Sequence, residues 1–106
     1  MNDDVFYKDE FVWSKQKNDK NKRKHHISFE TASLVFDDPF YMEVYDKENS
    51  TDEERFRVTG TVTGLVGGSY VTVSVTYRDS LIRIFSARDA VPDEIRSYNE
   101  ILSENA

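Results

Sequence analysis

Side chains that bind phosphate gather in one short segment of this 106-residue chain. Residues 15–26, KQKNDKNKRKHH, hold six Lys or Arg, two His, one Asp and no apolar side chain. On a helix, the spacing of Lys17, Asn21 and Lys24 places them on one face, with His25 next to Lys24. A concentration of positive charge attracts phosphate groups. The segment therefore favours an anionic partner.

The rest of the chain is acidic. The formal net charge is -6, whereas residues 15–26 alone carry six basic side chains against one acidic, or +5. The other 94 residues carry eight basic and nineteen acidic side chains, or -11. Because phosphate responds to local potential more than to net charge, the acidic total does not exclude a nucleic-acid partner. The alternative, a solvated Lys-rich helix face, stays open.

The composition indicates one globular domain. Hydrophobic residues make up 38% of the chain and aromatic residues 13%, which argues against disorder. There is no cysteine to form a disulfide or a thiolate metal site. No apolar run approaches the length of a membrane span, and the N-terminus lacks the apolar stretch of a secretory signal. We expect a cytoplasmic protein without membrane contact, with residues 1–9 as a flexible lead-in and residues 10–106 as a single domain.

Two helices are predicted in the first half. A short strand at 10–13 leads to Ser14, an N-cap for a helix over about 15–25. That helix would be polar on every side, so its ends or a partner must hold it. Ser28 caps a second, amphipathic helix that Asp37-Asp38-Pro39 ends. A strand at 40–46 and a polar loop at 47–54 follow.

The second half alternates polar and apolar residues as strands do. Strands are predicted at 55–63, 69–78 and 81–88, with a glycine-rich turn at 64–68 and a tight turn at Asp79-Ser80. Pro92 opens a last helix. The predicted fold is α+β, an antiparallel β-sheet with the two N-terminal helices and the C-terminal helix packed on one face.

Motifs along the chain resemble those of BrnT-type toxins. They are W-S-x-x-K-x-x-x-N-x-x-K-H from Trp13, ISFETASLVFDDP from Ile27, EERF at 53–56, Thr76-Tyr77-Arg78, IRIFSARDA at 82–90, and Glu94 with Tyr98. The resemblance covers residues 10 to 100. It implies a RelE-like fold and a metal-independent endoribonuclease without a cofactor. It also implies a type II toxin–antitoxin pair, in which a BrnA-like antitoxin neutralises the toxin. The toxin would contact operator DNA only through the antitoxin.

The resemblance also implies roles for the basic residues. A ribonuclease that uses the RNA 2′-hydroxyl must align it, help remove its proton and stabilise charge on the phosphate. We expect His25 to act as acid–base residue, with Tyr98 second, and four arginines to bind the phosphate: Arg55, Arg78, Arg83 and Arg88. The expected RNA contacts are Lys17, Asn21, Lys24 and Arg57. The products would be a 2′,3′-cyclic phosphate and a 5′-hydroxyl.

Structural alternatives accompany these roles. Arg83 is alternatively a surface cation that pairs with Glu43 or Glu53. His25 is alternatively a cation at the C-terminal end of its helix. Tyr98 is as compatible with packing on the sheet as with catalysis. Asp37-Asp38 is explained more simply as a helix stop than as a metal pair, so we assign no metal.

Besides Phe56, which mildly departs from the family's tryptophan, two positions depart from the family pattern in ways that bear on function. His26 stands where a glycine is usual, and Asp89 stands where a lysine is usual. If residue 26 has a positive φ, His is costlier there than Gly. Asp89 places an anion beside Arg88. Together with the acidic total, Asp89 favours an alternative function: a catalytically weak or inactive module that binds a DNA-binding antitoxin and tunes its affinity for the operator.

Overall fold

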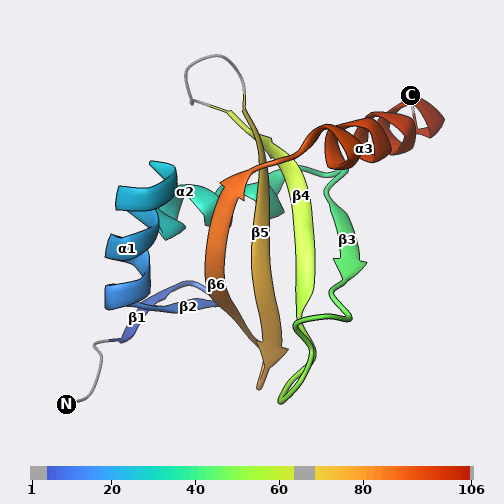
Figure 1. The fold of residues 1–106 in the computed structure, drawn as a ribbon. Helices are drawn as coiled ribbons and strands as arrows, with labels where there is room; N and C mark the ends of the chain where they lie inside the picture. The colour runs from blue at the N-terminus through green and yellow to red at the C-terminus, as the bar shows by residue number, and fades with distance from the viewer. Residues whose placement is uncertain (1–4, 64–68, 106) are drawn as a thin grey trace.

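A computed structural model describes residues 5–63 and 69–105 (Figure 1). Its elements are β1 (Val5–Lys8), β2 (Phe11–Ser14), α1 (Lys15–His25), α2 (Phe29–Ser33), the 3₁₀ helix η1 (Leu34–Asp37), β3 (Met42–Tyr45), β4 (Phe56–Val62), β5 (Ser69–Arg78), β6 (Leu81–Asp89) and α3 (Pro92–Glu104). The predicted α+β class is confirmed. The predicted turn at 64–68 lies outside the described residues.

The six strands form one mixed sheet in the order β1-β2-β6-β5-β4-β3. Neighbouring strands are antiparallel except β2 and β6, which run parallel with Phe11 opposite Ile82 and Trp13 opposite Ile84. The prediction of a purely antiparallel sheet is therefore wrong. Strand β2 is an interior strand because it pairs with β1 on one side and β6 on the other, and Phe11, Val12 and Trp13 are all buried, as in a strand covered on both faces.

Strand β1 forms one edge of the sheet. Val5–Lys8 pairs antiparallel with β2, although the sequence predicts a flexible lead-in over residues 1–9 and does not predict this strand. Phe6 is 48% exposed and Tyr7 67% exposed. Because neither face of β1 is well buried, the strand lacks the alternation of apolar and polar residues that reveals a strand in sequence.

One face of the sheet carries the apolar core. Side chains alternate between the two faces of a strand, so the predicted alternation of β4 and β5 sends every second residue into this core. The buried core residues of these strands and of the helical segment behind them are Val58, Val62, Val71, Val73, Val75, Phe29, Ala32 and Val35. In Figure 1, α2 lies behind the sheet, against this face.

Helix α3 lies on the opposite face. Thr72, which alternates with the buried Val71 and Val73, donates from Oγ1 to Glu94 at the start of α3 (2.9 Å). The ring of Tyr70 packs edge-on against Tyr98 of α3. The prediction that all helices share one face is therefore wrong. Since α3 docks through hydrogen bonds as well as rings, it suits a face that the apolar core does not occupy. No described helix is long and apolar enough to cross a membrane.

Helix α1 is held by polar side chains and by its ends. Ser14 caps it, because its Oγ accepts the Lys17 N–H (3.1 Å). Asn18 and Asn21 are its buried residues. At the C-terminal end, His26 has a φ of 61° and its N–H donates to the Lys22 carbonyl (3.0 Å). Residue 26 therefore has the positive φ at which we expected His to be less stable than Gly.

Candidate nucleic-acid interface

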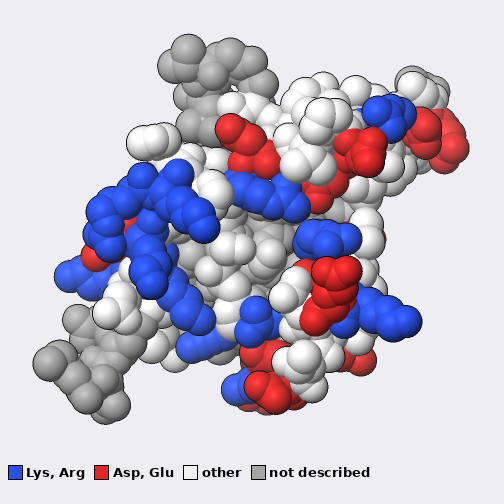
Figure 2. All heavy atoms as spheres, viewed as in Figure 1, with Lys and Arg blue, Asp and Glu red and all other residues white. Residues whose placement is uncertain are grey.

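The sheet face opposite the core is open between α1 and α3. The hydroxyl side chains of β4 and β5 that alternate with the buried valines lie on this side of the sheet; Ser74 is half-buried there, whereas Thr59 and Thr76 are buried. Figure 2 shows a pale hollow at the centre of this face, with Lys and Arg side chains around it. We call this surface the open face. Lys and Arg dominate its rim on the side of α1.

A β-bulge at Phe85 determines which side chains of β6 reach the open face. Ile84 pairs with Val75 and Ser86 pairs with Ser74, so Phe85 is the extra residue between them. In a regular strand, Arg83 and Arg88 would point to opposite faces, because they are five residues apart. With the bulge, they pair with Thr76 and Thr72 and share the open face.

The Phe85 ring is contacted by cations from two other elements. The Arg55 guanidinium carbon lies 4.1 Å from the ring centroid, and Lys17 Nζ lies 5.1 Å from it. Each such cation–π contact is worth about 0.5–1 kcal/mol at an exposed site. Phe85 therefore brings a strand-end arginine and a lysine of α1 together, although they are far apart in the sequence.

Helix α1 forms one wall of a hollow beside Phe85. The hollow is lined by Lys17, Lys20, Asn21, Lys24, His25, Phe85 and Ser86. The predicted helical face of Lys17, Lys24 and His25 thus borders the open face. His25 is the last residue of α1, but the hydrogen bond that caps the helix comes from the His26 backbone. The imidazole is half-buried in the wall of the hollow.

Asn21 has a structural contact. Its Nδ2 donates to the carbonyls of Ile27 and Ala87 (2.9 Å each), and its Oδ1 accepts the Ala87 N–H (3.1 Å). The amide thus pairs with β6 as a neighbouring strand would. Because Asn21 is 7% exposed and all three contacts are inside the protein, its amide holds α1 on the sheet.

Arg88 is occupied by an acidic partner. Its guanidinium donates to both carboxylate oxygens of Glu94 (2.8 and 3.1 Å). Burial by itself raises the pKa of Glu94, but hydrogen bonds from Arg88, the Val91 N–H and Thr72 outweigh it and hold that pKa below its usual value. Glu94 therefore stays ionised, and a phosphate must share Arg88 with it or displace it.

The other predicted arginines differ in their partners. Arg78 pairs with Glu53 (2.9 Å) and Arg57 lies 3.6 Å from Asp46. Arg83 has no ion pair or side-chain hydrogen bond within residues 5–63 and 69–105. The alternative that Arg83 pairs with Glu43 or Glu53 is therefore wrong. Its half-buried guanidinium has donors to offer a ligand.

Tyr98 lies away from Phe85 and its hydroxyl is engaged. The residue is 3% exposed, and its hydroxyl donates to Asp38 Oδ2 (2.5 Å). The same carboxylate accepts the backbone and side chain of Thr61 (2.9 Å each) and the Phe40 N–H. Burial and Asp38 raise the pKa of Tyr98. These contacts favour the packing interpretation of Tyr98.

Two residues of the interface are not among the predicted site residues. Phe85 is an aromatic side chain in a strand of alternating Ile and Arg, and this is a sequence signal for an exposed ring. Glu94 is named in the family motif, but its pairing with Arg88 depends on how α3 docks. Nothing in the local sequence indicates that contact.

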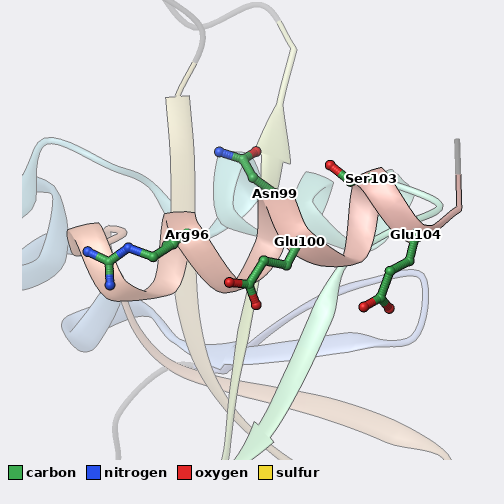
Figure 3. A pocket seen from close by; sticks show the side chains of 5 residues that line it. All are labelled: Arg96, Asn99, Glu100, Ser103 and Glu104. Atoms are coloured by element: carbon green, nitrogen blue, oxygen red, sulfur yellow. The ribbon is translucent and has the colours of Figure 1, made fainter.

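Neither acidic residues nor the α3 surface offer a second site. In the described part of the chain, no three His, Asp or Glu side chains converge as metal ligands, and Asp38 is already held by four donors. Figure 3 shows a hollow on α3 lined by Arg96, Asn99, Glu100, Ser103 and Glu104. Because these side chains come from one helix and point to different sides of it, they form no constellation.

Comparison with known proteins identifies the family. A search of curated proteins finds no match. The family model described as "Ribonuclease toxin, BrnT, of type II toxin-antitoxin system" matches residues 13–94, which is most of the chain. The match spans α1, the bulge at Phe85 and Glu94, and so includes most of the open face. The chain therefore belongs to the BrnT family of ribonuclease toxins of type II toxin–antitoxin systems.

Proposed function

We propose that this chain is a metal-independent endoribonuclease with a RelE-like fold, and that it cleaves single RNA strands on the open face. The observation that carries the proposal is the meeting of Arg55 and Lys17 on the Phe85 ring, beside His25. Phosphate-binding cations and an imidazole are groups that such a reaction needs in one place, and an aromatic ring adds a surface on which a base can stack.

The proposed reaction follows from the substrate. The 2′-hydroxyl oxygen attacks the adjacent phosphorus while its proton is removed, and the bond from phosphorus to the 5′-oxygen breaks. That oxygen takes up a proton, which leaves a 2′,3′-cyclic phosphate and a 5′-hydroxyl. His25 serves as the acid–base residue, because histidine exchanges protons near neutral pH. Arg55, Arg83 and Lys17 bind the phosphate and stabilise the charge that develops on it.

The test is cleavage of a fluorescent single-stranded RNA by purified protein in the presence of EDTA. We expect His25→Ala, Arg55→Ala and Arg83→Ala each to lower the rate by about 10²-fold or more. Arg96→Ala is the matched control, because Arg96 is exposed on α3 and pairs with Asp93. A 2′-deoxy nucleotide at the cleaved position should abolish cleavage there. Loss of wild-type activity in EDTA would overturn metal independence.

The proposed regulator is a BrnA-like antitoxin that covers the open face with an acidic segment. The +5 segment 15–26 lies along one side of that face, so an anionic chain can replace the RNA there. We expect Lys17→Glu, Lys20→Glu and Lys24→Glu together to weaken the complex with a BrnA-like antitoxin. Operator DNA would be bound through the antitoxin. Unchanged affinity of the triple variant would refute this placement.

A second candidate function has its own support. Arg88 is held by Glu94 and Arg78 by Glu53, so two of the four expected phosphate-binding arginines have acidic partners. A catalytically weak module that binds its antitoxin and tunes operator affinity would tolerate this. Expression without antitoxin separates the two functions. Growth arrest that Arg83→Ala relieves supports the nuclease, whereas harmless expression of folded protein supports the binding module.

A further inference from the structure

A second hollow lies on the open face next to β1. Its lining includes Tyr7 from β1, Val12 from β2, Thr76 and Arg78 from β5, and Arg83 from β6. Tyr7 is opposite Val12, and Val12 is opposite Arg83, so these three side chains are neighbours on the same face. An aromatic ring and a guanidinium thus lie in one row across three strands, with Val12 between them.

The chemistry of this hollow suits a nucleotide. Tyr7 is 67% exposed and offers a ring on which a base can stack. Arg83 has no protein partner among the described residues and offers its donors to a phosphate. The charged residues of the lining are Arg78, Arg83 and Asp79, and because Arg78 is paired with Glu53, Arg83 is the cation that the hollow offers to a ligand.

The hollow is continuous with the proposed cleavage site. Arg83 and Phe85 are two residues apart on β6, about 7 Å at the rise of a strand. A strand of RNA that has one phosphate at Phe85 and Arg55 therefore brings a neighbouring nucleotide to Tyr7. Both residues of β1 that line the hollow, Val5 and Tyr7, precede the part of the chain that the family model matches, residues 13–94.

We infer that the Tyr7–Arg83 hollow is a nucleotide-binding subsite, in which Tyr7 stacks on the base next to the cleaved phosphodiester while Arg83 binds the cleaved phosphate beside it. The inference rests on the proposed ribonuclease function. The subsite extends the open face to strand β1, which lies before the residues that the family model matches. Tyr7 binds and positions the substrate in this inference and takes no part in the chemical step.

The test is binding of fully 2′-O-methylated RNA oligonucleotides, which cannot be cleaved because the 2′-oxygen is blocked. Fluorescence anisotropy with oligonucleotides of increasing length should show that Tyr7→Ala weakens binding at least about fivefold, the lower end for one stacked base. Tyr7→Phe should bind as the wild type does. Phe6→Ala is the matched control, because Phe6 is an exposed neighbour on the other face of β1.

Abasic positions then identify the base. In a series of oligonucleotides that each lack one base, we expect one position at which removal of the base weakens binding by the wild type. At that same position, removal of the base should not weaken binding by Tyr7→Ala. Equal losses for both proteins at every position, or unchanged binding by Tyr7→Ala, would overturn the subsite. If the wild type cleaves RNA but Tyr7→Ala binds equally well, only the subsite fails. If the wild type binds no oligonucleotide, the proposed function fails as well.

A protein occupant is distinguished in the same experiment. If Tyr7→Ala leaves every oligonucleotide unaffected but weakens the complex with the antitoxin, the hollow belongs to a protein interface and the nucleotide subsite is refuted. The thermal midpoint of each variant checks folding. Because Tyr7 is mostly exposed and lies on an edge strand, we expect the midpoint of Tyr7→Ala to stay close to that of the wild type.

Discussion

Replacing Asn21 by Ala separates a structural role from RNA contact. In the structure, its side-chain amide makes three hydrogen bonds, to the Ile27 carbonyl and to both backbone groups of Ala87. Strand β2 pairs with β6 only from Ile82 to Ile84. Beyond the end of β2, the Asn21 amide supplies the hydrogen-bond partners of the β6 backbone at Ala87. The substitution leaves Ala87 without these partners in a buried place.

The expected loss of stability is large. Each net hydrogen bond contributes about 1 kcal/mol, and each buried group left unpaired costs about 1–3 kcal/mol. We therefore expect Asn21→Ala to lower the free energy of unfolding by about 3–5 kcal/mol. Domains of this kind have about 5–15 kcal/mol in total. The thermal midpoint should fall by roughly 12 °C or more.

Urea denaturation followed by circular dichroism measures this loss. Lys20→Ala is the control, because Lys20 is an exposed residue on the same helix and should change stability by less than about 0.5 kcal/mol. If Asn21→Ala stays within about 1 kcal/mol of the wild type yet loses RNA affinity, the structural role is refuted. Asn21 would then be the RNA contact that its place in the sequence motif suggests.

Four further predictions concern the open face and α3. Tyr98→Phe should cost about 1.5–3 kcal/mol of stability at neutral pH by urea denaturation, because a hydroxyl bond to a buried carboxylate is lost. Burial alone raises the pKa of Asp38, but its bonds from Tyr98, Thr61 and Phe40 lower it overall. The stability that ionised Asp38 contributes should therefore be complete above about pH 5. It should be lost as the pH falls through the pKa of Asp38 in the unfolded chain and then through its lowered pKa in the folded protein. If the urea midpoint of Asp38→Asn depends on acid pH as the wild type does, this prediction is contradicted. Glu94→Gln should tighten RNA binding roughly two- to fivefold by removing a partly exposed charge pair at Arg88, and weaker binding by folded protein would show that Glu94 positions Arg88 for RNA. Phe85→Ala should weaken RNA binding at least about fivefold in anisotropy while Phe85→Tyr keeps it, and equal affinity of all three proteins would remove the ring from the interface.

Local sequence signals predict most of the secondary structure. Ser14 and Ser28 accept the hydrogen bonds of helix N-caps, as expected from their positions. Pro92 opens α3, and the valines of β5 alternate into the core. These features depend on neighbours within a few residues, so sequence patterns report them directly. Strand β1 escapes prediction because it is an exposed edge strand.

The sequence by itself determined the class of fold, the basic helix and the family, because caps, alternation and motifs are local properties of the chain. Only the tertiary structure decided which residues share the open face. The bulge at Phe85 shifts the phase of β6 and places Arg83 and Arg88 on one side. The docking of α3 pairs Arg88 with Glu94, and the amide of Asn21 holds α1 beside the sheet. These contacts join residues distant in the chain, and strand register and helix docking decide them.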